Sequence, residues 1–182
     1  RDAYLRAIEL VPDNSDWYYR LGCVFRKDNL FAEAESAFVR AVELNSGDSK
    51  AIVNLATVLD AQGKRSEAIQ VYHQAIIADD TNVEAHHNLG SIHAETGRYR
   101  EAILCYEAAL NLSPDPEISL NLGKVHFQTG DIDMALSYLD SAVSADKTLL
   151  SGFYWQGLVR MKKGMFHSAL ESFDGIVDIV GV

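Results

Sequence analysis

The chain has few of the residues on which many small folds depend: two cysteines and three prolines in 182 residues, and no long apolar run. Two cysteines, Cys23 and Cys105, cannot build a disulfide framework, which favours a reducing compartment. Few prolines leave long segments free to be helical. No apolar run approaches the ~20 residues that span a bilayer. We therefore expect an intracellular, cytoplasmic protein with no membrane partner, the periplasm being the alternative.

Positive charge is also scarce, with 16 Lys and Arg against 26 Asp and Glu and a net charge of −10. A nucleic-acid surface needs clustered cations, so we expect no nucleic-acid partner. Hydrophobic residues make up 48% of the chain, which is enough for a packed core and excludes global disorder. The acidity suits solubility, and a basic partner is the alternative interpretation.

What the sequence does contain is an internal repeat. A small residue is followed twelve positions later by an alanine in five segments: Gly22–Ala34, Ala56–Ala68, Gly90–Ala102, Gly123–Ala135 and Gly157–Ala169. Successive pairs are 34, 34, 33 and 34 residues apart. A second alanine follows seven residues after the first, at Ala41, Ala75, Ala109 and Ala142. A period of this length is typical of stacked helical hairpins.

Each repeat predicts two helices joined by a short turn. In residues 83–115, Leu89 and Ile92 share one face of the first helix, and Ala102 and Tyr106 share one face of the second. The turn column holds Asn29, Gly63, Gly97, Gly130 and Gly164. Glycine, or asparagine in its place, predicts a left-handed residue where the first helix ends. The small columns let the two helices approach closely, so a bulky side chain there should overpack the contact.

These columns resemble the tetratricopeptide repeat (TPR) family, whose signature runs W-x2-L-G-x2-Y, then A-x3-F, then P. Residues 15–48, for example, carry Tyr18, Leu21, Gly22, Phe25, Ala34, Phe38 and Ala41. The resemblance covers the whole chain and implies an all-α fold, a right-handed α-solenoid of TPR helical hairpins. It makes residues 1–182 one TPR array: 1–14 as the second half of a repeat, 15–48, 49–82, 83–115 and 116–149 as full repeats, and 150–182 as a last, divergent repeat.

The last repeat departs from the pattern. Gln156 replaces the expected leucine and Ile176 replaces the second alanine, so we expect less regular packing in this hairpin. The end of the chain is apolar, with Ile176, Val177, Ile179, Val180 and Val182. Terminal repeats normally carry a polar outer face. We expect that the native protein continues in both directions, or that another chain covers this end, self-association included.

Within the family, the first helix of each hairpin lines a concave groove, so the resemblance also implies a binding surface. The column just before the leucine holds Arg20, Asn54, Asn88, Asn121 and Trp155. The three asparagines resemble a ladder in the TPR region of O-linked N-acetylglucosamine transferases, which grips extended polypeptide. An asparagine amide both donates and accepts hydrogen bonds, so it suits peptide backbone. The alternative is that these asparagines bond between neighbouring helices of the protein itself.

Lys50, His87 and Lys124 fall on the same implied surface and complete the predicted peptide-binding set. The lysine clamp of TPRs that bind chaperone tails is missing, because its column holds Tyr19, Val53, His87 and Leu120. We therefore expect no co-chaperone role.

Patterns for catalysis are missing as well. The sequence has no phosphate-binding glycine loop and no nucleophile elbow. His86 and His93 occupy the columns of Tyr18 and Phe25, which indicates packing, and the Cys/His spacing of zinc sites is absent. We expect no catalytic residue, metal or cofactor, and hence no enzyme. The predicted function is a scaffold that binds a protein or peptide. The alternative is a substrate-recruiting arm of a glycosyltransferase-like enzyme whose catalytic domain lies outside this chain.

Overall fold

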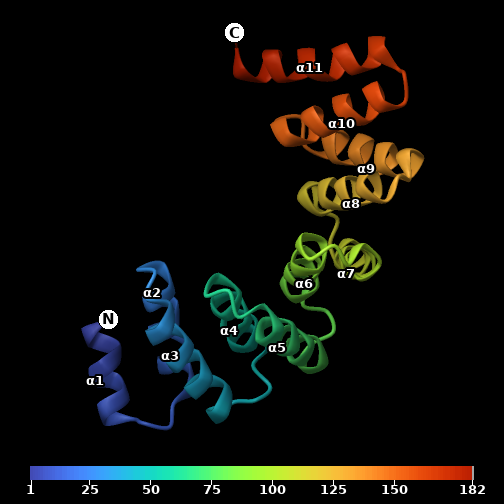
Figure 1. The fold of residues 1–182 in the computed structure, drawn as a ribbon. Helices are drawn as coiled ribbons and strands as arrows, with labels where there is room; N and C mark the ends of the chain where they lie inside the picture. The colour runs from blue at the N-terminus through green and yellow to red at the C-terminus, as the bar shows by residue number, and fades with distance from the viewer. Residues whose placement is uncertain (182) are drawn as a thin grey trace. The chain divides into compact units, whose positions relative to one another are not determined.

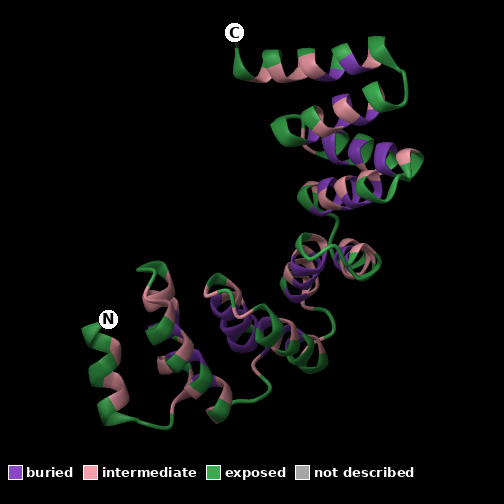
Figure 2. Cartoon of the chain, in the orientation of Figure 1, coloured by how far each residue is buried: buried purple, intermediate pink, exposed green. Residues whose placement is uncertain are grey.

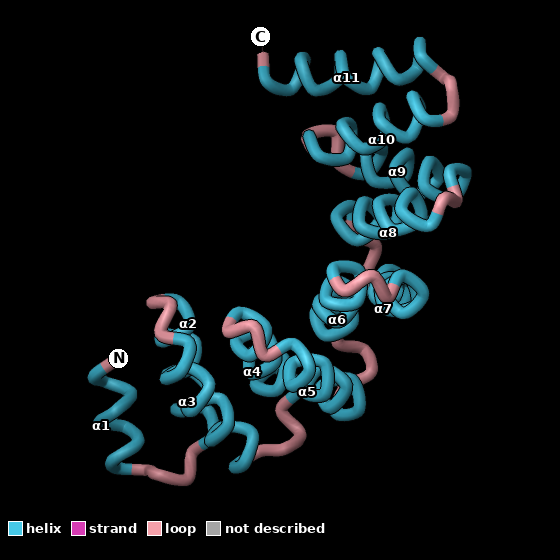
Figure 3. The backbone as a smooth tube through the Cα atoms, in the orientation of Figure 1, coloured by secondary structure: helices cyan, strands magenta, loops and turns pink. Residues whose placement is uncertain are grey.

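The computed structural model describes residues 1–181, and these form eleven α-helices and no strand (Figure 3). The helices are α1 (Asp2–Leu10), α2 (Ser15–Lys27), α3 (Phe31–Leu44), α4 (Ser49–Ala61), α5 (Arg65–Ala78), α6 (Val83–Glu95), α7 (Tyr99–Leu112), α8 (Pro116–Thr129), α9 (Ile132–Ala145), α10 (Leu150–Lys162) and α11 (Phe166–Val180). The predicted all-α fold is confirmed. Val182, part of the predicted apolar end, lies outside the described residues.

The chain divides into two compact units, Arg1–Ile92 and His93–Val182. In the first unit, α2 packs against α3 and α4 packs against α5, so each pair forms a hairpin (Figure 1). In the second unit, α8 packs against α9 and α10 against α11 in the same way. Contacts of α3 with α4, and of α9 with α10, join successive hairpins within each unit. A hairpin cannot bury its apolar face alone, so this stacking supplies the core.

Short polar side chains begin several helices. The Asn14 Oδ1 atom accepts hydrogen bonds from the backbone nitrogens of Asp16 and Trp17, at 3.0 and 3.3 Å. Asp48 caps α4 in the same manner, and Asp115 caps α8 by accepting from the Glu117 nitrogen at 2.7 Å. Each cap satisfies backbone donors that the helix itself leaves unpaired.

The predicted left-handed turn residues are confirmed. The φ angles are 58° at Asn29, 78° at Gly63, 74° at Gly97, 85° at Gly130 and 82° at Gly164. An L-amino acid with a larger or branched side chain is strained in this region, whereas glycine is not and asparagine tolerates it. The chain can therefore reverse between the two helices of a hairpin within a few residues.

The small-residue columns lie in the core, as predicted. Ala34, Ala68, Ala102 and Ala135 are fully buried, and Figure 2 shows the buried stripes of the packed helices. A Cβ atom built on Gly123 would lie 2.6 Å from Leu139 Cγ, so the helix α8 touches the side chains of α9 directly. This closeness leaves no room for a larger residue.

The last hairpin packs through a polar network in place of the missing leucine. Gln156 of α10 is buried, and its Nε2 donates to Asp140 Oδ1 of α9 at 2.6 Å. Ser172 of α11 donates to Gln156 Oε1 at 2.8 Å. The Arg160 guanidinium donates to Asp140 at 3.1 Å and to Ser172 Oγ at 2.9 Å. The sequence predicts less regular packing in this hairpin, but it does not predict these hydrogen-bond partners. They satisfy the buried amide of Gln156.

Candidate functional site

Five predicted peptide-binding residues lie on first helices of the first unit: Arg20 on α2, Lys50 and Asn54 on α4, His87 and Asn88 on α6. Arg20 and Lys50 are exposed, His87 and Asn88 are half-buried, and Asn54 is buried. The Arg20 Nε atom donates to Asp16 Oδ2 at 2.7 Å, one helical turn earlier. The two cations are therefore accessible to a ligand, whereas Asn54 belongs to the inner part of the surface.

Asn54 carries an unusual hydrogen-bonding arrangement. Its side chain is only 8% exposed, and its Nδ2 atom donates to the Lys50 carbonyl oxygen at 2.8 Å. The Oδ1 atom on the other side of the amide is buried and has no donor. A buried acceptor without a partner costs about 1–3 kcal/mol. The side chain is thus held in a conformation that satisfies one half of the amide and leaves the other half unpaired.

Asn88 lies beside the hydroxyl of Tyr72 on α5. The Tyr72 hydroxyl is 3.0 Å from Thr57 Oγ1 of α4 and also hydrogen-bonds to the Asn88 side chain. Burial raises the pKa of Tyr72 above its usual value, and the bonds to Thr57 and Asn88 partly oppose that rise. The phenol therefore stays protonated at neutral pH. Two hydroxyls and one amide thus connect α4, α5 and α6 at this point.

The second unit brings together the other three predicted residues, Asn121 and Lys124 of α8 and Trp155 of α10. The Lys124 Nζ atom lies 3.5 Å from Asn121 Oδ1 and 5.9 Å from the centre of the Trp155 ring. An ammonium group above an indole face is a cation–π contact. This surface therefore combines a cation, an amide and an aromatic ring on adjacent first helices, whose contact the structure also records.

Two aromatic residues outside the predicted set complete this surface. The Phe127 ring meets Trp155 edge to face at 6.0 Å, and the exposed Tyr154 ring meets it at 6.2 Å. Tyr154 occupies the column of His87, which belongs to the predicted set, so extending that column through the last repeat would identify it from the sequence. Phe127 lies three residues after Lys124. No sequence column identifies it, and only its ring contact with Trp155 shows that it belongs to this surface.

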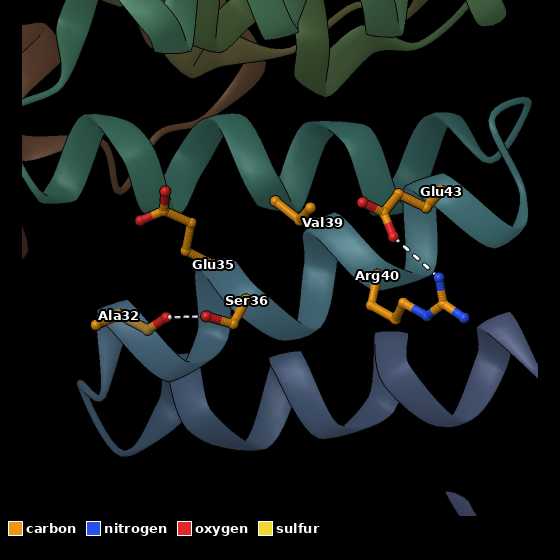
Figure 4. Close-up of a pocket in the computed structure, with 6 residues that line it drawn as sticks. All are labelled: Ala32, Glu35, Ser36, Val39, Arg40 and Glu43. Carbon is orange, nitrogen blue, oxygen red and sulfur yellow. Dashed lines mark hydrogen bonds and ion pairs between the residues drawn. The ribbon is translucent and has the colours of Figure 1, made fainter. Parts of the chain in front are cut away.

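A separate hollow of about 550 Å³ lies along α3, a second helix of the first unit (Figure 4). It is lined by Ala32, Glu35, Ser36, Val39, Arg40 and Glu43. Its polar groups are already bonded within the chain: Arg40 pairs with Glu43 at 3.0 Å, and Ser36 donates to the Ala32 oxygen at 3.0 Å. None of the predicted binding residues lies in this hollow.

Within residues 1–181, no group of three or more His, Cys, Asp or Glu side chains could hold a metal ion, and no helix is long and apolar enough to cross a membrane. Burial raises the pKa of the Cys105 thiol to about 11, with a smaller effect from Glu101, so this thiol stays protonated at neutral pH.

The helices thus define a protein class, the all-α proteins built from a repeated helical hairpin. Family models described as TPR repeat match residues 56–97 and 90–130, and models described as tetratricopeptide repeat match residues 1–49 and 116–149. The chain belongs to the tetratricopeptide repeat family. No curated protein matches it significantly in sequence.

Solved structures share the fold at low sequence identity. YrrB, described as a TPR protein with an unusual peptide-binding site, is 24% identical with a TM-score of 0.80, over 97% of this chain and 92% of YrrB. MamA from Desulfovibrio magneticus is 16% identical with a TM-score of 0.83, over 91% and 94%. PilF from Pseudomonas aeruginosa is 22% identical with a TM-score of 0.82, over 91% and 76%. The predicted TPR fold is confirmed.

Proposed function

We propose that this chain is a non-catalytic protein-interaction scaffold that binds an extended polypeptide segment on the first-helix faces of its hairpins. Extended peptides offer backbone donors and acceptors at regular intervals, and amide side chains can pair with both. The proposed contacts are Asn54 and Asn88 in the first unit and Asn121 in the second. Arg20, Lys50 and His87 lie on the first helices of the first unit, and Lys124 and Trp155 lie on those of the second.

The unpaired Oδ1 atom of Asn54 is the observation that carries the proposal. A purely structural asparagine would be expected to have both halves of its amide satisfied, because buried polar groups are nearly always paired. A peptide N–H could supply the missing donor if the Asn54 side chain turned outward from its bond to the Lys50 oxygen. The cost of the unpaired atom in the free protein would then be relieved on binding.

In the second unit, the surface around Trp155 supports a ligand that has both apolar and acidic side chains. Tyr154 offers an exposed aromatic ring, and aromatic rings carry much of the energy at binding surfaces. Lys124 stands above Trp155 as a point charge that would attract a carboxylate. The peptide-binding site stated for YrrB, which shares the fold, also supports a peptide ligand for this chain.

The test begins with peptides selected from a random library on the immobilised chain. One selected peptide is then titrated against the unmodified protein and against the triple variant Asn54→Ala, Asn88→Ala, Asn121→Ala. Each lost hydrogen bond should cost about 0.5–1.5 kcal/mol, so affinity should fall by about tenfold or more. The matched control is Asn111→Ala, which removes an exposed asparagine from the second helix α7.

N-methylation of the peptide separates backbone recognition from side-chain recognition. If the asparagines bond to peptide backbone, methylating alternate amides should weaken binding to the unmodified protein and have little further effect on the triple variant. Equal affinity of the triple variant and the unmodified protein would refute the proposed site. Failure of any peptide to bind would refute the proposed function.

A substrate-recruiting arm of a glycosyltransferase-like enzyme is the second candidate. The repeated asparagines favour this candidate, because a site that bonds only to peptide backbone would bind polypeptides of many different sequences. The library distinguishes the two: selected peptides without a shared sequence pattern support a recruiting arm, and one common motif supports a scaffold for a dedicated partner.

A further inference from the structure

Two hydroxyls in the first unit form a chain of hydrogen bonds with a fixed direction. Thr57 of α4 donates its hydroxyl hydrogen to the Val53 carbonyl oxygen, one turn earlier, at 2.9 Å. A hydroxyl has a single hydrogen, so the Thr57 oxygen can only accept from the Tyr72 hydroxyl of α5, which lies 3.0 Å away. Tyr72 is only 2% exposed, and buried hydroxyls take their partners from within the protein. The hydrogen of the phenol is therefore committed to Thr57.

This direction determines how the amide of Asn88 on α6 is oriented. The Asn88 side chain hydrogen-bonds to the Tyr72 hydroxyl. Because the phenol has given its hydrogen to Thr57, its oxygen can only accept, and the amide group can donate only through its nitrogen. The Nδ2 atom of Asn88 thus points to Tyr72. The Oδ1 atom lies at the opposite end of the amide, where it can accept a hydrogen bond from a ligand.

The same residue types recur one repeat later, 33 or 34 positions along the chain, as Ser91, Tyr106 and Asn121. Ser91 again donates to the carbonyl oxygen four positions before it, that of His87, at 3.1 Å. The Asn121 Oδ1 atom accepts from Lys124 Nζ at 3.5 Å. In this asparagine, too, the oxygen is an end of the amide that accepts from a donor.

Asn54 of α4 shows the arrangement without a phenol. The residue 34 positions before Tyr72 is Phe38, which has no hydroxyl to accept from the amide. The Asn54 Nδ2 atom donates to the Lys50 carbonyl oxygen at 2.8 Å instead, and Oδ1 has no donor. In both Asn54 and Asn88, the protein therefore binds the nitrogen of the amide. The oxygen is the end that remains to bind a ligand.

We propose that Tyr72 is a positioning residue that makes Asn88 a hydrogen-bond acceptor, and that the first unit consequently selects peptide segments with backbone N–H groups facing α4 and α6. This inference rests on the proposed peptide-binding function and adds a specificity to it. Proline and N-methylated residues have no backbone N–H. A segment that places either of them opposite Asn54 or Asn88 binds weakly, because an acceptor oxygen then meets a carbon atom.

The test is an N-methyl scan of one peptide selected from the random library on the full chain. Each backbone amide of the peptide is methylated in turn, and each product is titrated against the unmodified protein. Methylation at the positions that face the two asparagines should lower affinity by about tenfold, since a hydrogen bond is lost and its acceptor is left unpaired. The position whose penalty disappears in Asn88→Ala is the one that faces Asn88.

Two variants test the orientation of the amide without changing Asn88. Tyr72→Phe removes the phenol oxygen, so the Asn88 amide is free to turn. Thr57→Val releases the hydrogen of the Tyr72 hydroxyl, which can then be donated to Asn88 Oδ1. In both variants, the penalty for methylation opposite Asn88 should shrink to about threefold or less. The penalty is a ratio of two affinities for the same protein, so a general loss of stability does not change it.

Tyr138→Phe is the matched control, because it removes a hydroxyl that donates to Glu107 at 3.4 Å in the second unit. It should leave the methylation profile unchanged, and circular dichroism checks the helical content of all variants. A profile that Tyr72→Phe and Thr57→Val leave unaltered overturns the proposal. A bound peptide that no single methylation weakens also overturns it, while the peptide-binding function stands. Failure of every library peptide to bind refutes that function, and this inference with it.

Discussion

Gly157 and Phe173 pack so closely that a Cβ atom built on the glycine would lie 2.5 Å from Cε1 of the phenylalanine ring. The same relationship recurs between Gly22 and Phe38, where the distance would be 2.7 Å. In both hairpins, an aromatic ring of the second helix packs directly against a glycine of the first helix. Close packing of this kind tolerates added volume poorly.

Gly157→Ala should therefore destabilise the second unit. Overpacking costs about 1–3 kcal/mol, and the gain of alanine over glycine in a helix offsets roughly 1 kcal/mol of it, so the net loss should be up to about 2 kcal/mol. Urea unfolding followed by circular dichroism measures the change. Gly47→Ala is the matched control, since its new Cβ would meet nothing closer than 3.7 Å. A Gly157→Ala protein as stable as the unmodified one would contradict the packing described.

The carboxylate of Glu35 should make stability depend on pH. The hydrogen bond from Lys64 lowers the pKa of Glu35, burial acts in the opposite direction, and Gln62 lowers it further. A carboxyl with a lowered pKa in the folded state stabilises the fold above its unfolded pKa of about 4.3. That contribution is lost as the pH falls through the lower folded value.

Glu35→Gln should consequently reduce the free energy of unfolding at neutral pH by about 0.2–1 kcal/mol and make little difference at strongly acidic pH. Unfolding curves at the two pH values measure this. Glu33→Gln, an exposed change on the same helix, serves as the control. A loss that is equally large in acid would show that the ion pair with Lys64 is not its source.

The regular columns of the sequence predict the fold because each column has a physical requirement that repeats. The turn position needs a left-handed residue, so Gly63 and Gly130 mark the ends of first helices in the sequence alone. The hairpin contact needs a small side chain, so Ala68 and Ala135 mark buried positions. Both requirements recur at a fixed position within each repeat, so a periodic sequence reveals them without knowledge of the structure.

The polar details cannot be predicted in this way, because they depend on partners in other helices. In the sequence, Gln156 only departs from the leucine of its column. In the structure it bonds to Asp140 and Ser172, which lie 16 positions before and after it. The inward turn of Asn54 toward the Lys50 oxygen depends on its side-chain conformation, which no column reveals. The aromatic surface likewise depends on the contact between Phe127 and Trp155.

Asn54→Leu tests the central claim most directly, with unfolding free energy and peptide affinity measured on the same protein. Leucine fills a similar volume and removes the unpaired oxygen, although it also loses the Nδ2 bond to the Lys50 oxygen, so the free protein should gain about 1 kcal/mol of stability on balance. Affinity for a library-selected peptide should fall by several-fold, since one proposed hydrogen bond is lost. A variant that loses stability and binds the peptide as tightly as before would show that Asn54 serves packing and not binding.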